Sequence, residues 1–314
     1  MRLHHTLVLS LACSEFSIED TDRQVTTPMT VEESFLHRTE PSVDVLLVID
    51  DTASMRSEHL MLSEALPVLI ETLQQAEISW QIGAITTDIM SPSAAILTGD
   101  PWVITSSTDE PLLHLQTMID VGTLGSQPEA GFASALMALT PPLVDGANRG
   151  LRRPNAALHV VVISDGDDNS EQILDTDPTE AFLAFLSEQS ATSGEPSRLS
   201  ALVGPSPNGC TGISGTALPG SKYLEVALES EGYIDSICDI DFEEMGNWIA
   251  TTSQPENPRF LLQASPRPTS IRVQVNDSRW DSGWTLLPDI PAIQFTNTPP
   301  AGAEIRVRYE VKSS

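Results

Sequence analysis

An aliphatic run that ends abruptly in acidic and hydroxyl side chains most constrains how this chain can fold. Residues Val45 to Ile49 are aliphatic without a break, a pattern typical of a strand that is buried on both faces. Such strands form parallel sheets in α/β proteins, whose ligands bind in loops at the carboxyl ends of the strands. Asp50, Thr52 and Ser54 follow at two-residue intervals, so one tight loop can bring their side-chain oxygens together.

The chemistry of these three side chains favours a hard divalent cation. Carboxylate and hydroxyl oxygens, with no thiolate or imidazole among them, suit Mg2+ first and Ca2+ or Mn2+ next. A simpler interpretation is that Thr52 or Ser54 caps the following helix, with Asp50 oriented toward the N-terminal end of that helix. The first motif alone does not distinguish a metal site from a helix cap.

Two later segments favour the metal site. Residues 156–163 are again mostly apolar and lead to Asp165, which would lie beside Asp50 if the two strands are neighbours in a parallel sheet. Between them, the glycine-punctuated segment 121–126 presents the hydroxyl of Thr123 just before a predicted helix. The three segments together predict one site built from loops at the same edge of the sheet.

This combination resembles the von Willebrand factor type A domain, whose metal-ion-dependent adhesion site combines an Asp-x-Ser-x-Ser loop with a distant Thr and a distant Asp. Thr52 stands where the family usually has Ser, and Gly-Thr-x-Gly around Thr123 differs from the commonest Gly-Gly-Thr form. The resemblance implies a Rossmann-like, doubly wound α/β fold and a cation that accepts a carboxylate from a partner protein. It also implies five metal ligands: Asp50, Thr52, Ser54, Thr123 and Asp165.

Enzyme classes that begin with a similar acidic loop lack their other residues here. A haloacid-dehalogenase-type phosphatase needs a second Asp where the chain has Thr52, and a receiver domain needs a lysine after a central strand. The two lysines, Lys222 and Lys312, do not follow such a strand. Phosphate-binding Gly-x-x-x-x-Gly-Lys loops, Gly-x-Ser-x-Gly elbows and His-Glu-x-x-His motifs are absent from the sequence. We therefore expect no enzymatic activity, and a metal-assisted hydrolase is the enzyme alternative.

The charge of the chain limits its partners. The 44 acidic and 16 basic residues give a net charge of -28, so we expect nucleic acid and anionic membrane surfaces to be repelled. Divalent cations and basic partners are attracted by the same field. Solubility or a saline habitat explains the acidic excess equally well.

The N-terminus indicates export. Residues 1–13 combine one arginine with a short apolar run and end in Ala-Cys, which resembles a signal peptide with a bacterial lipobox. Cys13 is then the lipidation site, and the remaining pair, Cys210 and Cys238, is expected to form a disulfide. Two buried thiols in a cytosolic protein are the alternative. The rest of the chain has no apolar stretch of the roughly 20 residues that a membrane span needs, so we expect membrane attachment only through lipid.

The remaining sequence divides into three parts. Residues 14–42 are polar and acidic and are predicted to be a flexible tether. Residues 43–263 alternate between strand-like and helix-like segments, which predicts a doubly wound, mostly parallel sheet that a strand at 260–263 closes. Residues 264–314 alternate with period two and predict a small all-β module of four strands.

The leading hypothesis is an exported protein of the bacterial cell envelope that binds a protein ligand through a divalent cation. The sequence leaves open a second hypothesis, a structural envelope lipoprotein with a vestigial metal site. It names neither the partner nor the oligomeric state.

Overall fold

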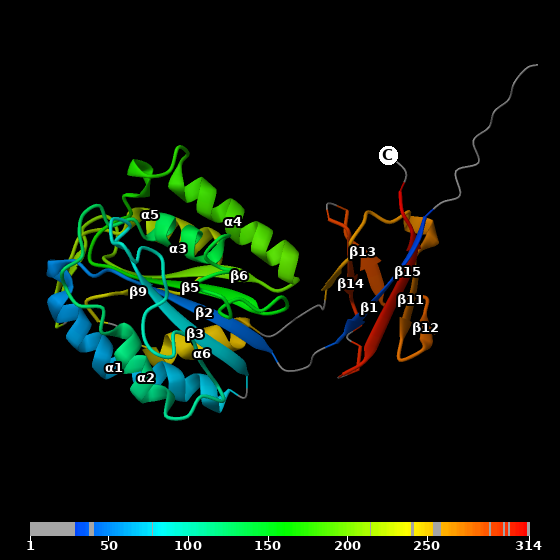
Figure 1. The fold of residues 1–314 in the computed structure, drawn as a ribbon, viewed down its shortest axis with the longest axis horizontal. Helices are drawn as coiled ribbons and strands as arrows, with labels where there is room; N and C mark the ends of the chain where they lie inside the picture. The colour runs from blue at the N-terminus through cyan, green and yellow to red at the C-terminus, as the bar shows by residue number, and fades with distance from the viewer. Residues whose placement is uncertain are drawn as a thin grey trace, which may run out of the picture.

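The computed structural model describes residues 29–37, 41–76, 78–213, 215–239, 242–253, 259–288, 290–297, 299–300 and 302–312. Two units lie side by side in it, an α/β unit and a smaller β module (Figure 1). The chain passes between them twice, once after residue 37 and once after residue 253. None of the described helices is long and apolar enough to cross a membrane.

The α/β unit is built on a six-stranded sheet in the order β4-β3-β2-β5-β6-β9. The aliphatic run lies in β2 at the centre, where Val45 pairs with Ile82 of β3 and with His159 of β5, both in parallel. Only β4 runs antiparallel. The predicted doubly wound, mostly parallel sheet is therefore confirmed. Its strands are β2 (Ser42–Ile49), β3 (Ser79–Thr86), β4 (Ile104–Thr105), β5 (Ala157–Ile163), β6 (Ser197–Val203) and β9 (Ile234–Ser236).

Helices cover both faces of this sheet, as Figure 1 shows. One face packs on α1 (Arg56–Gln75), α2 (Pro111–Ile119) and α6 (Phe242–Thr252), and the other packs on α3 (Gly131–Leu139), α4 (Pro178–Ser193) and α5 (Ser221–Glu229). Because successive side chains of a strand point to opposite faces, β2 contributes to both apolar cores. Val45 and Leu47 belong to the first core, and Leu46 and Val48 to the second. Short 3-10 turns lie at Ala53–Met55 (η1), Ser170–Gln172 (η2) and Pro268–Ser270 (η3).

The β module contains more of the chain than the sequence predicted. One sheet has the order β1-β15-β11-β12 and the other β10-β14-β13, with an apolar core between them. Its strands are β1 (Thr30–Leu36), β10 (Arg259–Leu261), β11 (Arg272–Val275), β12 (Ser278–Trp280), β13 (Trp284–Leu286), β14 (Ala292–Phe295) and β15 (Glu304–Glu310).

Two predicted boundaries are corrected by this arrangement. Residues 30–36, assigned to the flexible tether 14–42, form strand β1 and pair along their whole length with β15. The strand predicted at 260–263 does not close the α/β sheet, because β10 pairs with β14 of the module. Only their pairing partners, which lie far away in the sequence, determine the unit to which these two strands belong. The segments 1–28 and 38–40 lie outside the described residues.

A disulfide-linked hairpin lies beside the carboxyl edge of the α/β sheet. Strands β7 (Cys210–Thr211) and β8 (Thr216–Ala217) pair with each other, and Cys210 is bonded to Cys238, which follows β9. The predicted disulfide is thus confirmed.

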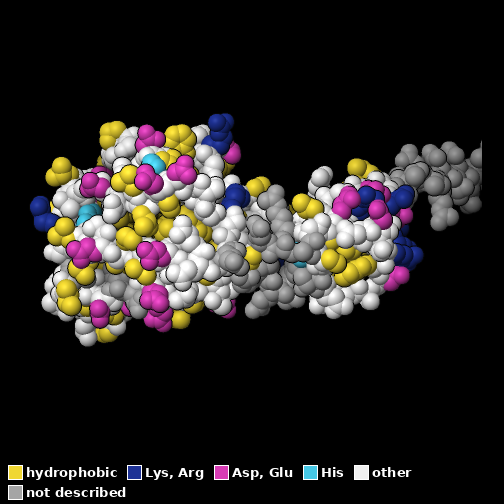
Figure 2. All heavy atoms as spheres, turned by 90° about the horizontal axis from the view of Figure 1, so that it is seen from below, with side chains coloured by type: hydrophobic (Ala, Val, Ile, Leu, Met, Phe, Trp, Pro, Cys, Tyr) yellow, Lys and Arg dark blue, Asp and Glu magenta, His cyan; other side chains and the backbone are white. Residues whose placement is uncertain are grey.

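Acidic side chains are spread over the α/β unit, whereas several Lys and Arg side chains gather on the β module (Figure 2). Residues 42–253 contain 31 acidic and 6 basic residues, and residues 254–314 contain 6 acidic and 7 basic residues. The negative field that we expected over the whole surface therefore belongs mainly to the α/β unit.

Candidate metal site

The loop after β2 folds back on the carboxylate that begins it. Asp50 is fully buried, and its Oδ1 accepts hydrogen bonds from the backbone N–H of Thr52 at 2.9 Å and from the Thr52 hydroxyl at 2.7 Å. The Thr52 hydroxyl lies 3.1 Å from that of Ser54. Neither Thr52 before η1 nor Met55 before α1 makes a capping side-chain hydrogen bond, so the helix-cap interpretation is wrong.

Asp165 joins this group from the neighbouring strand. It follows β5, which pairs with β2 in parallel, and its Oδ1 accepts a hydrogen bond from the Ser54 hydroxyl at 3.2 Å. Ser164 donates to the other oxygen of Asp50, Oδ2, at 2.7 Å. Four of the five predicted residues therefore form one connected group at the carboxyl edge of the sheet. Ser164 thus orients the Asp50 carboxylate, although the sequence analysis did not single out this residue.

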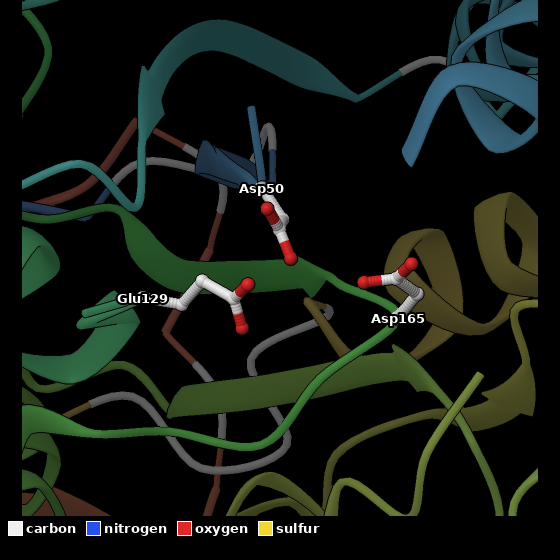
Figure 3. A group of neighbouring side chains, drawn as sticks. All are labelled: Asp50, Glu129 and Asp165. Atoms are coloured by element: carbon white, nitrogen blue, oxygen red, sulfur yellow. The ribbon is translucent and has the colours of Figure 1, made fainter. Parts of the chain in front are cut away.

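Glu129 is the residue that sequence reasoning missed. Its side chain is buried, and one of its carboxylate oxygens lies within 4.8 Å of carboxylate oxygens of Asp50 and Asp165. Figure 3 shows the three carboxylates converging from three different loops. Gly166 makes this approach possible, because a Cβ at that position would collide with the Glu129 carboxylate. An acid that lies just before α3 thus joins the cluster.

Thr123 lies in the predicted loop but not in the hydrogen-bonded group. Its loop reaches the site, because the N–H of Gly125 donates to the backbone carbonyl of Asp51 at 2.8 Å. The Thr123 side chain is half-buried and makes no hydrogen bond with another described residue. Its assignment as a ligand stays a prediction, and Glu129 is the residue from this loop region that the structure brings to the cluster.

Burial and mutual repulsion disfavour ionisation of the clustered carboxylates. Burial, with the neighbouring charge of Asp50 next in importance, raises the pKa of Glu129 to about 7. The pKa of Asp165 is raised by the same two effects. Burial, together with the charges of Asp88 and Asp50, raises the pKa of Asp51 to about 6. The Glu129 carboxyl, with a pKa of about 7, is therefore partly protonated at neutral pH unless a positive charge stabilises its ionised form.

Lysine and arginine side chains do not supply that charge in the part of the chain that the structure describes. Among the described residues, no lysine or arginine forms an ion pair with Asp50, Glu129 or Asp165. The Nε2 atom of His59 lies 2.8 Å from the backbone carbonyl oxygen of Asp50, and the charge of this imidazole partly offsets the increase in the pKa of Asp165. Three buried carboxylates and two adjacent hydroxyls form an all-oxygen donor set, which fits a hard divalent cation. The residues present are consistent with a metal site.

Comparisons with known proteins give structural similarities only. No protein-family model and no curated protein matches the chain. A von Willebrand factor type A protein from Catenulispora acidiphila aligns with 91% of this chain and 66% of its own at 14% identity and a TM-score of 0.43. Proximal thread matrix protein 1 from the mussel byssus, solved with a zinc-occupied metal-ion-dependent adhesion site, aligns over 73% of this chain and 52% of its own at 13% identity and a TM-score of 0.41.

A pilus adhesin from Lactobacillus rhamnosus aligns with 93% of this chain and 42% of its own, at 12% identity and a TM-score of 0.41. This chain therefore spans between about two fifths and two thirds of the length of these structures. At these values the similarities establish neither family nor function.

Proposed function

We propose that this protein is an exported, non-enzymatic binding protein of the von Willebrand factor A type, in which a divalent cation mediates attachment to a partner. The observation that carries the proposal is the convergence of Asp50, Glu129 and Asp165 beside the hydroxyls of Thr52 and Ser54. The three carboxylates are buried, and among the described residues no lysine or arginine forms an ion pair with them. These five residues would hold the cation, with Mg2+ as our first candidate and Ca2+ or Mn2+ as alternatives.

The bound cation would supply a positive charge that accepts a carboxylate from a partner protein. The protein residues hold and orient the donor oxygens, since Ser164 and the Thr52 N–H fix the Asp50 carboxylate between them. The disulfide supports an oxidising location outside the cytosol. Attachment to a bacterial envelope through a lipid on Cys13 belongs to the same proposal, and Cys13 lies outside the described residues.

Calorimetric titration with Mg2+ tests the metal site. Asp50→Ala should abolish binding, because Asp50 is at the centre of the group and three hydrogen bonds converge on it. The wild type should gain stability with Mg2+ by mass action, about 2.7 kcal/mol when the cation is a hundredfold above its Kd. Asp167→Ala is the control, since Oδ1 of Asp167 accepts hydrogen bonds from backbone N–H groups of Asp168 and Lys222 and lies outside the cluster.

Equal Mg2+ binding by wild type and Asp50→Ala would contradict the proposed site. Absence of binding in the wild type for Mg2+, Ca2+ and Mn2+ alike would instead favour the hypothesis of a structural protein with a vestigial site.

A further inference from the structure

The loops around the candidate metal site carry unusually exposed apolar side chains. Leu124 is 98% exposed, Ile213 87%, Leu218 70% and Met90 64%. Leu124 and Ile213 have the largest exposed fractions of the large hydrophobic side chains in the part of the chain that the structure describes. We call Met90, Leu124, Ile213 and Leu218 the apolar rim. Exposed apolar side chains that gather at one place, rather than singly, indicate a surface that another molecule covers.

Two members of the rim are held directly by the loops of the metal site. The backbone N–H of Leu218 donates to the carbonyl of Asp165 at 2.8 Å, so Leu218 lies against a proposed ligand. Leu124 precedes Gly125, whose N–H donates to the carbonyl of Asp51 at 2.8 Å. A Cβ at Gly125 would collide with the Asp51 carboxylate, which shows how closely this loop packs on the residue next to Asp50.

The other two members come from the flanks of the same edge. The N–H of Met90 donates to Oδ1 of Asp88, which also accepts the hydroxyl of Ser126 in the loop that carries Leu124. Ile213 lies between β7 and β8 in the disulfide-linked hairpin, where a Cβ at Gly215 would collide with the Glu58 carboxylate. Glu58 is close enough to Asp165 and Asp50 for their charges to contribute to the increase in its pKa. These contacts thus place the rim residues on three loops and a hairpin at the edge of the sheet that carries the cluster.

The charge of the cluster makes apolar contact with the rim important for the affinity of a partner. A divalent cation among Asp50, Glu129 and Asp165 leaves a formal net charge of -1 when all three are ionised, because Glu129 adds a third carboxylate. Such a cation attracts an additional carboxylate less strongly than one held by fewer acids. Apolar contact must then supply a large part of the affinity, and it is available only from the side chains that flank the incoming acid.

We propose that the apolar rim selects a partner segment in which the metal-binding Asp or Glu is flanked by large aliphatic or aromatic side chains. This inference rests on the proposed function and specifies its partner. Acidic peptides with polar neighbours would lack the contacts with Leu124 and Leu218 and would bind weakly.

Selection from a library of displayed random peptides tests the inference. The full chain serves as bait in Mg2+, and bound peptides are eluted with chelator. We expect enriched peptides to contain an acidic residue next to Leu, Ile, Val, Met or Phe. The affinity of a synthetic peptide of the enriched sequence should fall at least about tenfold in Leu124→Ser/Leu218→Ser, since two apolar contacts are lost.

Leu113→Ser/Leu228→Ser is the matched control, because these leucines are 56% and 72% exposed but lie on α2 and α5, outside the loops of the metal edge. Equal affinities of the two double variants, or enriched acids with polar neighbours, would overturn the role of the rim and leave the proposed function intact. Failure of chelator to release any enriched peptide, or enriched peptides that contain no acid, would contradict the proposed function itself. Calorimetry with Mg2+ alone should give the same result for both double variants and the wild type.

Discussion

At the scale of single residues, Glu129 determines the chemistry of the site. A hydroxyl ligand at this position would leave two clustered carboxylates, whereas Glu129 makes three. The third acid strengthens attraction for a cation and raises the cost of leaving the site without one, as the pKa of about 7 for its carboxyl shows. This residue would therefore couple binding of the proposed cation to pH in the neutral range.

We expect Mg2+ affinity to rise as pH increases through 7 and to level off above it. The cation needs ionised Glu129, and the raised pKa means that the metal-free carboxyl still holds its proton below about pH 7. The same shift makes the metal-free fold less stable as pH rises from the ordinary Glu value toward 7, because in this range the unfolded state has released the proton that folded Glu129 still holds. Titrations in two buffers of different ionisation enthalpy measure the released proton.

Glu129→Gln should bind Mg2+ more weakly at pH 8 and should lose most of this pH dependence. Glu188→Gln is the control, since Glu188 is exposed on α4. A Glu129→Gln protein with the affinity and proton release of the wild type would show that this carboxylate takes no part in binding.

At the scale of elements, the disulfide fixes a short hairpin that could not hold its place alone. Strands β7 and β8 have two residues each, too few for an independent sheet. The bond from Cys210 to Cys238 spans 28 residues and joins this hairpin to the segment after β9, beside the carboxyl edge. The Ser236 hydroxyl, 3.2 Å from the Cys210 sulfur, adds a further contact at this junction.

Cys210→Ser/Cys238→Ser should lower the free energy of unfolding by about 3–4 kcal/mol, the value expected for closing a loop of this length in the unfolded chain. Urea denaturation measures the change. Mg2+ binding should remain, because Asp50, Glu129 and Asp165 are held by the main sheet and by α3 rather than by the hairpin. Unchanged stability, or loss of metal binding in a folded variant, would contradict this division of roles.

At the scale of the whole molecule, the two ends of the described chain close one module. Strand β1 pairs with β15, and its buried residue Glu33 accepts hydrogen bonds from the Tyr309 hydroxyl at 2.6 Å and from the N–H of Gln263 at 3.0 Å. Strand β2 then runs from Ser42, near the module, to Ile49, so the metal site lies at the end of the α/β unit that is away from the module (Figure 1). The described residues of the module therefore do not cover that edge.

Glu33→Ala should destabilise the module by about 1–3 kcal/mol, because it leaves the buried Tyr309 hydroxyl and the N–H of Gln263 without their acceptor. Glu32→Ala, at the exposed neighbouring position of the same strand, is the matched control. Calorimetric unfolding compares the two. An equal loss in both variants would show that β1 is held by its backbone pairing and not by Glu33.

The sequence by itself determined the central part of the fold and four residues of the site. The aliphatic run from Val45 to Ile49 requires a strand that is buried on both faces. A parallel sheet provides this burial and brings the carboxyl ends of β2 and β5 together. Asp50 and Asp165 become neighbours for that reason, and Thr52 and Ser54 follow from a local loop.

Only the tertiary structure decided what depends on distant partners. Glu129 reaches the cluster because the loop before α3 packs over Gly166, a contact that no local pattern encodes. Strands β1 and β10 belong to the module because they pair with β15 and β14, whereas their own sequences suit a tether or another sheet equally well. Local periodicity specifies which backbone a segment adopts, but the partner of an edge strand or of a loop is selected by packing across the whole chain.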